Sequence, residues 1–253
     1  MAWIDTSVCL GHPEYPDLAT EDKLLTAMDA ADISMAWIFG YDAIGTHDFD
    51  ASNNAVQRIA AKHPDRFVPI GLINPVLAFP AVNRLLDNGF KSIKVVCGWG
   101  NWLTIDNIRR LVGPVVEALH GRGLHVSVTV EGNVPTRGGS AYIPLVIREV
   151  SLDIPLIVDR CWTPQAWEDY LTIAKQDPSL WFSLNSLPQR LLERVVGELG
   201  LHRVLLASWY PETDLEIVQH QIARAVPEVS DPGSVFAANA MRALSGQHPK
   251  SKG

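Results

Sequence analysis

Residues 3–9 read WIDTSVC, residues 21–31 read EDKLLTAMDAA and residues 33–39 read ISMAWIF. The first and third segments are short and rich in β-branched and aromatic residues, which is typical of strands. The middle segment has helical periodicity and follows Thr20 with two acidic residues, which is a common helix start. The three segments therefore predict a strand, a helix and a second strand, the repeating unit of α/β proteins.

The same unit recurs along the chain. Strands are expected over residues 3–9, 33–39, 67–73, 92–96, 124–130, 155–160, 180–185 and 204–208, and helices near residues 21–31, 51–62, 79–88, 105–120, 140–150, 164–175, 188–199 and 214–225. Eight such units in 253 residues match the size and repeat of a (β/α)8 TIM barrel. A doubly wound open sheet is the alternative, but it usually has a glycine-rich first turn, whereas the first strand here runs into CLGHPEYPD. We expect one barrel domain over residues 1–246 and a flexible tail over residues 247–253.

The composition restricts the class of protein. With 47% hydrophobic and 19% charged residues, the chain suits a globular fold and not a disordered one. The formal charge of −7 disfavours a nucleic-acid or anionic-membrane partner, and the sequence shows neither an apolar run of membrane length nor a basic signal-peptide start. Three cysteines cannot form a disulfide framework, so we expect a cytoplasmic protein.

Alternation within a strand separates the interior face of a barrel from the face that meets the helices. In residues 126–131 (VSVTVE) the valines must meet the helices, so Thr129 and Glu131 face the interior, with Glu131 nearest the C-terminal end. Similar reasoning buries Lys94 in the interior, where we expect it to pair with Asp5. Barrel enzymes act at the C-terminal ends of their strands, and the candidate residues there are Ser7, Cys9, Thr129, Glu131, Arg160, Asn185 and Trp209.

Aromatic side chains gather near the same strand ends. They are Tyr41, Trp99, Trp102, Trp162 and Trp209. Such a set can line a pocket for a planar or apolar ligand, or it can pack loops together or form a subunit interface. His12 and His47 lie on loops of this side, where each can serve as an acid or base or can simply be solvated.

Several motifs resemble those of the amidohydrolase-related family of barrel hydrolases and decarboxylases. They are residues 28–33 (MDAADI), 53–67 (NNAVQRIAAKHPDRF), 89–94 (GFKSIK), 191–194 (LLER) and 239–240 (NA). The branch concerned includes aminocarboxymuconate-semialdehyde decarboxylase and the pyrone-dicarboxylate lactonase. This resemblance implies the barrel fold, hydrolysis or non-oxidative decarboxylation of a small molecule, and a homodimer.

The resemblance also implies where metal ligands would lie, and those positions have changed. Ser7 and Cys9 stand in place of the two histidines of the family's first-strand I-D-x-H-x-H motif. Thr129 replaces the fifth-strand histidine, Arg160 the sixth-strand histidine and Trp209 the eighth-strand aspartate. A divalent cation needs three or more N, O or S donors, which these residues do not supply, and the guanidinium would repel it. We therefore expect no metal and no other cofactor.

Each remaining candidate has a chemical and a structural interpretation. Arg160 can hold a carboxylate or oxyanion by two parallel hydrogen bonds, or it can form an ion pair with Glu131 or Asp159. Glu131 can act as a general base or as a salt-bridge partner. Cys9 can be a nucleophile if Arg160 or Lys94 lowers its pKa, or it can be a small buried residue.

Two functions follow from these candidates. The first is a metal-independent amidohydrolase-like enzyme that acts on a small anionic or aromatic molecule, by hydrolysis of a lactone, ester or amide or by non-oxidative decarboxylation. In that enzyme Arg160 holds the anion, Glu131 or His12 moves protons, and Thr129 and Asn185 orient the substrate. The alternative is a catalytically inactive protein of the same fold that binds a ligand or serves as a scaffold.

Overall fold

The computed structural model describes residues 3–43, 48–73, 78–95, 127–131, 155–161 and 167–249. The chain divides into two compact units. The first unit contains Met1–Ile70, Ser183–Met241 and Lys252–Gly253, and the second contains Gly71–Phe182 and Arg242–Ser251. The expected helices over residues 105–120 and 140–150 lie outside the described residues.

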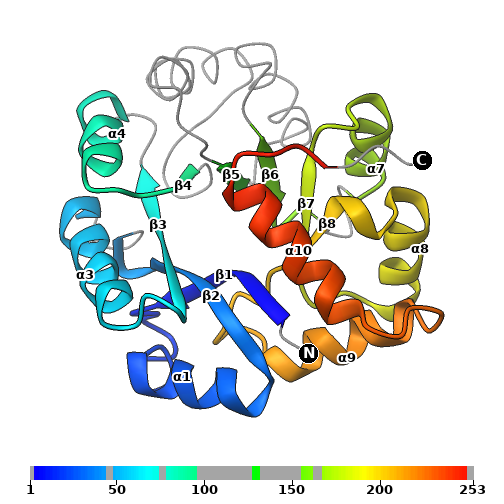
Figure 1. The fold of residues 1–253 in the computed structure, drawn as a ribbon, viewed down its shortest axis with the longest axis horizontal. Coiled ribbons are helices and arrows are strands. Elements are labelled where there is room, and N and C mark those ends of the chain that lie inside the picture. Colours follow the sequence, from blue (N-terminus) through cyan, green and yellow to red (C-terminus); the bar gives the residue numbers. More distant parts are fainter. Residues whose placement is uncertain are drawn as a thin grey trace. The chain divides into compact units, whose positions relative to one another are not determined.

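The fold is the predicted (β/α)8 barrel, with parallel strands that follow one another in sequence order (Figure 1). The strands are β1 (Trp3–Leu10), β2 (Ile33–Gly40), β3 (Phe67–Ile73), β4 (Ser92–Val95), β5 (Ser127–Glu131), β6 (Leu156–Asp159), β7 (Trp181–Leu184) and β8 (Val204–Leu206). The helices are α1 (Glu21–Ala30), α3 (Phe49–Lys62), α4 (Ala78–Asp87), α7 (Trp167–Gln176), α8 (Gln189–Leu199), α9 (Leu215–Ala225) and α10 (Pro232–Leu244). A 3-10 turn, η3 (Leu201–Arg203), precedes β8.

In the first unit, β1 pairs with β2 on one side and with β8 on the other. Every residue of β1 after Trp3 is buried, which is the usual state of a parallel strand covered on both faces. The helices bury apolar stripes; in α8 these are Leu192, Val195, Val196 and Leu199, at the spacing of one helix face. The sequence pattern predicted these elements because buried strand and helix faces carry apolar residues at a regular spacing.

The helix α10 was not predicted from the sequence. It begins with Pro232 and Gly233, which as a pair are typical of a turn. Gly233 is required there by packing, because a Cβ at that position would lie 2.9 Å from Nε1 of Trp3. The Trp3 ring also lies 5.6 Å from the ring of Phe236. Long-range packing against the start of β1, rather than a local start signal, therefore fixes the beginning of this helix.

In the second unit, β4, β5, β6 and β7 pair in parallel. Lys94 is level with Thr129, and Thr129 is level with Ile157, so these three residues form one row across the sheet. Two residues further toward the C-terminal ends of these strands, Glu131 is level with Asp159, which gives the next row. This register sets which side chains of the second unit can meet.

Residues near the end of the chain also contact the second unit. The indole N–H of Trp181 donates to the Gln247 carbonyl at 2.9 Å, and a guanidinium N–H of Arg242 donates to the His248 carbonyl at 2.8 Å. The boundary at residue 246 stays a prediction. Among the described residues, no helix has the length and hydropathy that crossing a membrane would require.

Candidate functional site

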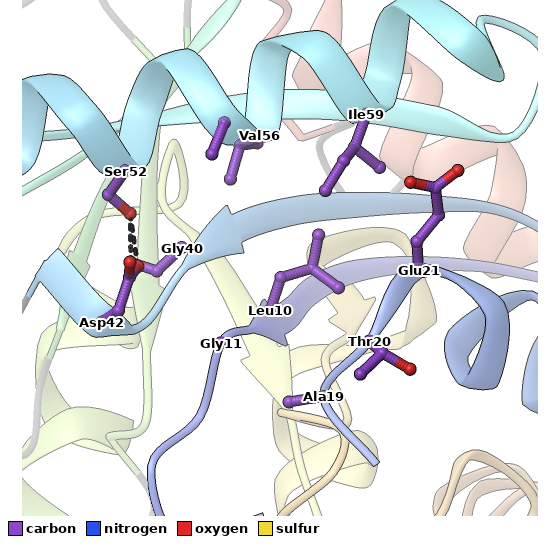
Figure 2. Close-up of a pocket in the computed structure, with 11 residues that line it drawn as sticks. Leu10, Gly11, Ala19, Thr20, Glu21, Gly40, Asp42, Ser52, Val56 and Ile59 are labelled. Atoms are coloured by element: carbon purple, nitrogen blue, oxygen red, sulfur yellow. Dashed lines mark hydrogen bonds between the residues drawn. The ribbon is translucent and has the colours of Figure 1, made fainter. Parts of the chain in front are cut away.

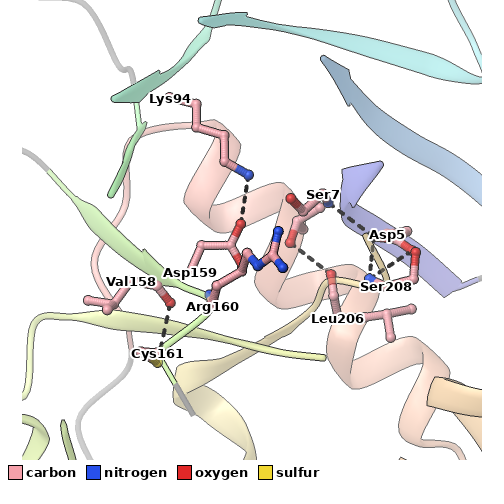
Figure 3. Close-up of polar contacts among 10 residues, drawn as sticks. Asp5, Ser7, Lys94, Val158, Asp159, Arg160, Cys161, Leu206 and Ser208 are labelled. Carbon is pink, nitrogen blue, oxygen red and sulfur yellow. Dashed lines mark hydrogen bonds and ion pairs between the residues drawn. The ribbon is translucent and has the colours of Figure 1, made fainter. Parts of the chain in front are cut away.

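In the first unit, a buried carboxylate ties β1 to the segment after β8. Asp5 is fully buried, and its Oδ1 accepts the backbone N–H of Ser7 at 3.0 Å. Its two carboxylate oxygens also accept the N–H of Ser208, at 3.2 and 3.3 Å (Figure 3). Thr6 adds a hydroxyl bond to the Leu206 carbonyl at 2.8 Å. The Asp5 carboxylate therefore accepts backbone N–H groups from β1 and from the segment after β8, and so links the two.

Ser7 and Cys9 hold the same segment through their backbones. The Ser7 carbonyl accepts from the N–H of Trp209, and the Cys9 N–H donates to the carbonyl of Tyr210, both at 2.9 Å. The Ser7 side chain is 2% exposed and Cys9 is fully buried. A nucleophilic thiol must be reached by its substrate, so this burial agrees with the structural interpretation of Cys9.

Trp209 is packed and not open to solvent. Its backbone has φ +59°, a left-handed conformation that is unusual for a residue with a side chain. Its ring is 2% exposed and meets Phe39 edge-on, with centroids 5.1 Å apart and an interplanar angle of 71°. Trp209 is therefore packed against Phe39 just beyond the end of β8.

His12 is buried, which differs from the solvated loop histidine that is common on such loops. It is 3% exposed and stacks on Tyr41, with centroids 4.0 Å apart. Its Nδ1 accepts the backbone N–H of Glu14 at 3.2 Å, so Nδ1 carries no proton, and its Nε2 lies 3.4 Å from a carboxylate oxygen of Glu212. This pattern selects the tautomer with the proton on Nε2. Both ring nitrogens face groups of the protein.

Asn185 follows β7, and its side-chain oxygen is a hydrogen-bond acceptor for which the described residues supply no donor. Its side-chain oxygen is buried, and within the described part of the structure no donor reaches it. A buried polar atom without a partner costs about 1–3 kcal/mol, so such atoms point to a missing water or ligand. The role of Asn185 in orienting a substrate stays a prediction.

In the second unit, the main electrostatic feature is a buried ion pair. Lys94 Nζ lies 2.8 Å from Oδ2 of Asp159, and both side chains are 1% exposed. The register explains this ion pair: Asp159 lies one row beyond Lys94, so the long lysine side chain reaches it along the strand direction. The expected pairing of Lys94 with Asp5 stays a prediction.

Arg160 follows β6 directly and is half-buried. Its backbone is left-handed, with φ +51°, and its N–H donates to Oδ1 of Asp159 at 2.9 Å (Figure 3). The Asp159 carboxylate is therefore held by a lysine on one oxygen and by a backbone N–H on the other. These contacts fix the position of the Arg160 backbone just after the end of β6.

Cys161 comes next in the chain and is fully buried. Burial raises the pKa of the Cys161 thiol well above its ordinary value of 9.0, and the negative charge of Asp159 raises it further. The thiol makes a weak contact with the Val158 carbonyl at 3.9 Å. A thiol that stays protonated is a poor attacking group.

Other candidates are placed only by backbone or fall outside the described residues. Glu131 ends β5 level with Asp159, and Thr129 is level with Lys94. The candidates that lie outside the described residues are His47, Trp99, Trp102 and Trp162. Their roles stay predictions.

Among the described residues of the first unit, the positions named above supply a poor set of metal ligands. Ser7 offers a hydroxyl and Cys9 a thiol, and the Trp209 indole offers a donor N–H and no lone pair. Within the described ranges, no group of three or more His, Cys, Asp or Glu side chains is placed to hold an ion. The donor chemistry at these positions therefore disagrees with the metal site that the resemblance implies, and no step below uses a metal.

Two residues that shape these sites were not candidates in their own right. Asp159 entered only as one of two internal partners for Arg160, although a lysine in the middle of a buried strand requires a buried carboxylate nearby. Glu212, which faces His12, lies three residues after Trp209 on the loop that follows β8. Its acidic character on a mouth-side loop was the available signal.

No protein-family model and no curated protein sequence matches this chain. Solved structures do match it in fold. A 2,6-dihydroxybenzoate decarboxylase from Rhizobium aligns with a TM-score of 0.73 at 14% identity, covering 96% of this chain and 98% of that one. A probable 2-pyrone-4,6-dicarboxylic acid hydrolase from Acinetobacter baumannii aligns at 0.71 with 15% identity, covering 97% and 100%. A dihydroxybenzoic acid decarboxylase from Polaromonas sp. JS666, with bound manganese and the inhibitor 2-nitroresorcinol, aligns at 0.70 with 15% identity, covering 96% of each chain. These likenesses extend over nearly the whole chain and show that it has the same barrel fold.

Proposed function

We propose that this protein is a metal-independent enzyme of the amidohydrolase-related type, which acts on a small anionic or aromatic molecule by hydrolysis or by non-oxidative decarboxylation. The fold neighbours support the general kind, because they are named as decarboxylases of dihydroxybenzoates and as a hydrolase of a pyrone dicarboxylate. The motifs quoted above support the family. The metal-free mechanism rests on the residues at the former ligand positions.

The observation that carries the proposal is the position of Arg160 at the C-terminal end of β6. Barrel enzymes act at this end of their strands. Lys94 Nζ and the backbone N–H of Arg160 hold the Asp159 carboxylate next to this position. The left-handed backbone of Arg160 costs about 1–2 kcal/mol relative to an ordinary conformation. Strain of this kind is typical of residues held in place for function.

The guanidinium would bind the substrate carboxylate by two parallel hydrogen bonds. In decarboxylation, the bond between the ring carbon and the carboxylate carbon breaks, carbon dioxide leaves, and the electron pair left on the ring carbon takes a proton. In hydrolysis, water attacks the carbonyl carbon and the cation stabilises the oxyanion that forms. Glu131, at the end of β5, is the proposed proton carrier in either reaction.

Aromatic acids and lactones provide the test. Purified protein with a chelator present is incubated with dihydroxybenzoates and with a pyrone dicarboxylate, and loss of substrate is followed by liquid chromatography. We expect turnover of at least one class without added metal. Activity that disappears with the chelator and returns with zinc or manganese would overturn the metal-free mechanism.

Variants of Arg160 test the clamp itself. Two charge-assisted hydrogen bonds at about 1.5 kcal/mol each correspond to about a 100-fold loss of affinity when Arg160→Ala removes them. Arg160→Lys keeps the charge but not the planar fork, so we expect an intermediate loss. Arg160→Gly removes the side chain and also the backbone strain of a positive φ. It should therefore bind the ligand as weakly as the alanine variant, but unfold at a higher temperature than the alanine variant. Unchanged binding by the alanine variant excludes the clamp.

A second candidate function is a ligand-binding protein without catalysis. It is favoured by the burial of Trp209 and by the partners on both nitrogens of His12, since neither side chain is open to a substrate. The two functions separate in one experiment. Saturable binding of an aromatic acid that depends on Arg160, together with no turnover over the whole substrate panel, supports the binding protein.

We also propose a cytoplasmic homodimer, in keeping with the resemblance and the cysteine content. Light scattering coupled to size-exclusion chromatography measures the mass directly. A mass near 27.8 kDa, that of one chain, would exclude the dimer.

A further inference from the structure

The first unit contains a pocket that the proposed function does not use. It has a volume of about 220 Å3 and lies among the ends of β1 and β2, the start of α1 and the inner face of α3 (Figure 2). At about 30 Å3 per water molecule this volume equals about seven waters, and an apolar cavity of about 150 Å3 is already large enough to hold benzene. A molecule of about six or seven non-hydrogen atoms would therefore fill the pocket.

The walls of the pocket are mainly apolar. The side chains of Leu10, Val56 and Ile59 point into it (Figure 2). Ala19 and Ala55 also line it, and their small side chains leave space that larger ones would fill. Such walls favour a ligand with a hydrocarbon body, because apolar surface gains free energy when it leaves water.

At one end of the pocket, polar contacts join the first turns of α3 to the end of β2. The Ser52 hydroxyl donates to Oδ1 of Asp42 at 2.7 Å and lies 3.2 Å from the Gly40 carbonyl oxygen (Figure 2). The helix and the strand approach closely here, because a Cβ on Gly40 would overlap Oγ of Ser52. This end of α3 is therefore held against β2.

At the other end, a second set of polar contacts joins α3 to the start of α1. Lys62 is the last residue of α3, and His63 follows it. Lys62 Nζ and His63 Nε2 each lie 2.9 Å from an oxygen of Glu21, the first residue of α1. The helix is anchored on both sides of Val56 and Ile59, so a movement of α3 that closed the pocket would disturb these contacts.

From this arrangement we infer that the pocket binds a small uncharged molecule of about six or seven non-hydrogen atoms with a hydrocarbon body, such as a straight-chain alcohol. Both carboxylates of the pocket, Asp42 and Glu21, already have partners in the protein. An ion would lose water contacts against the apolar walls, whereas an uncharged molecule loses few. Gly11 and Thr20 line the pocket and are exposed, so a ligand can enter from solvent. The inference goes beyond the proposed function, since no candidate residue for that chemistry lines this pocket.

Titration of methyl-labelled protein with straight-chain alcohols, followed by NMR, tests the site. We expect saturable shifts of the methyl signals of Leu10, Val56 and Ile59. Each added CH2 from 1-butanol to 1-hexanol should tighten binding by about fourfold, which is the burial of one CH2 expressed as an affinity, and 1-octanol should bring no further gain because the pocket is full. Hexylammonium and hexanoate should bind at least tenfold more weakly than 1-hexanol. An affinity that does not depend on chain length, or an ion that binds as tightly as 1-hexanol, would overturn the inference.

Two variants and a matched control complete the test. Ala55→Leu should fill the pocket and weaken 1-hexanol binding by at least tenfold, while leucine keeps the helix favourable. Ala51→Leu adds the same side chain at an exposed position of the same helix, outside the lining, and should leave binding unchanged. Ile59→Ala enlarges the pocket, so this variant should bind 1-octanol more tightly than the wild type does. The site is excluded if Ala55→Leu is folded by circular dichroism and binds 1-hexanol as the wild type does. If Ala55→Leu does not fold, unchanged binding of 1-octanol by Ile59→Ala excludes it instead.

Discussion

The buried ion pair of the second unit makes a quantitative prediction about stability. Lys94 and Asp159 are each 1% exposed and lie 2.8 Å apart, so removal of one takes a close opposite charge away from the other, which stays buried. Breaking such a pair typically costs about 3–5 kcal/mol. For a chain of this size, each kcal/mol shifts the unfolding temperature by about 2–4 °C. We therefore expect Lys94→Met to lower that temperature by about 6–20 °C.

A double-mutant cycle separates the pair from the shape of the side chains. Lys94→Met, Asp159→Asn and the combined variant are unfolded by urea and by heat, beside Lys91→Met as a control on an exposed lysine in the same segment. In the combined variant no buried charge remains, and the asparagine oxygen can still accept the Arg160 N–H. The combined loss should be smaller than the sum of the two single losses by about 2 kcal/mol or more.

The result that would refute this reasoning is additivity. If the two single losses simply add, or if Lys94→Met costs less than about 1 kcal/mol, the pair is solvated and is not a buried one. The Lys91 control should stay within about 0.5 kcal/mol of the wild type, as exposed substitutions usually do.

Further predictions concern single contacts. Lys62 and then His63 lower the pKa of Glu21 below its ordinary 4.5, so the stabilisation is present above pH 4.5 and is lost as the pH falls through the lowered pKa. Glu21→Gln should therefore be less stable than wild type by about 0.5 kcal/mol at pH 7, and the difference should shrink as the pH falls below 4.5, measured by urea unfolding. Gly40→Ala should cost about 1–3 kcal/mol, because the new Cβ meets Oγ of Ser52 at 1.9 Å, and Ser52→Ala in the same chain should recover much of that loss. Cys161 should resist a thiol reagent at pH 8 in the folded state and react in urea, since burial raises its pKa and denies access; rapid labelling of the native protein would show that this segment opens.

Much of the fold could be predicted because each buried strand appears in the sequence as a short run of β-branched and aromatic residues. The run Phe67–Ile73 is the clearest case, since the expected and observed bounds agree. The helix Pro232–Leu244 has no comparable local pattern, because its start depends on the approach of Trp3 to Gly233 across more than two hundred residues of chain. Local propensity describes a segment and its solvent exposure, whereas this contact joins distant segments.

The sequence proposes members of the candidate site but does not give their contacts. Alternation assigns Lys94 to an interior face, but its ion pair with Asp159 depends on the register of strands that are far apart in the sequence. The burial of His12 depends in the same way on Tyr41 and Glu212, which lie on other loops. A pattern of residue types names the residues that need partners, and only the tertiary structure selects which partners they receive.

The two left-handed residues at the strand ends connect the fold to the proposed chemistry. Arg160 follows β6 with φ +51°, and Trp209 lies beyond β8 with φ +59°. Both stand where the resemblance places metal ligands, and the other non-glycine residue with positive φ among those described, Asp32, precedes β2 at its opposite end. At about 1–2 kcal/mol each, this strain is not needed to end a strand, because glycine or asparagine would do so at lower cost. A large side chain retained in a strained conformation indicates that the side chain itself matters. For Trp209 the packing on Phe39 supplies that reason. For Arg160, the Lys94–Asp159 pair fixes the backbone from which the guanidinium extends, which is the arrangement that an anion clamp requires.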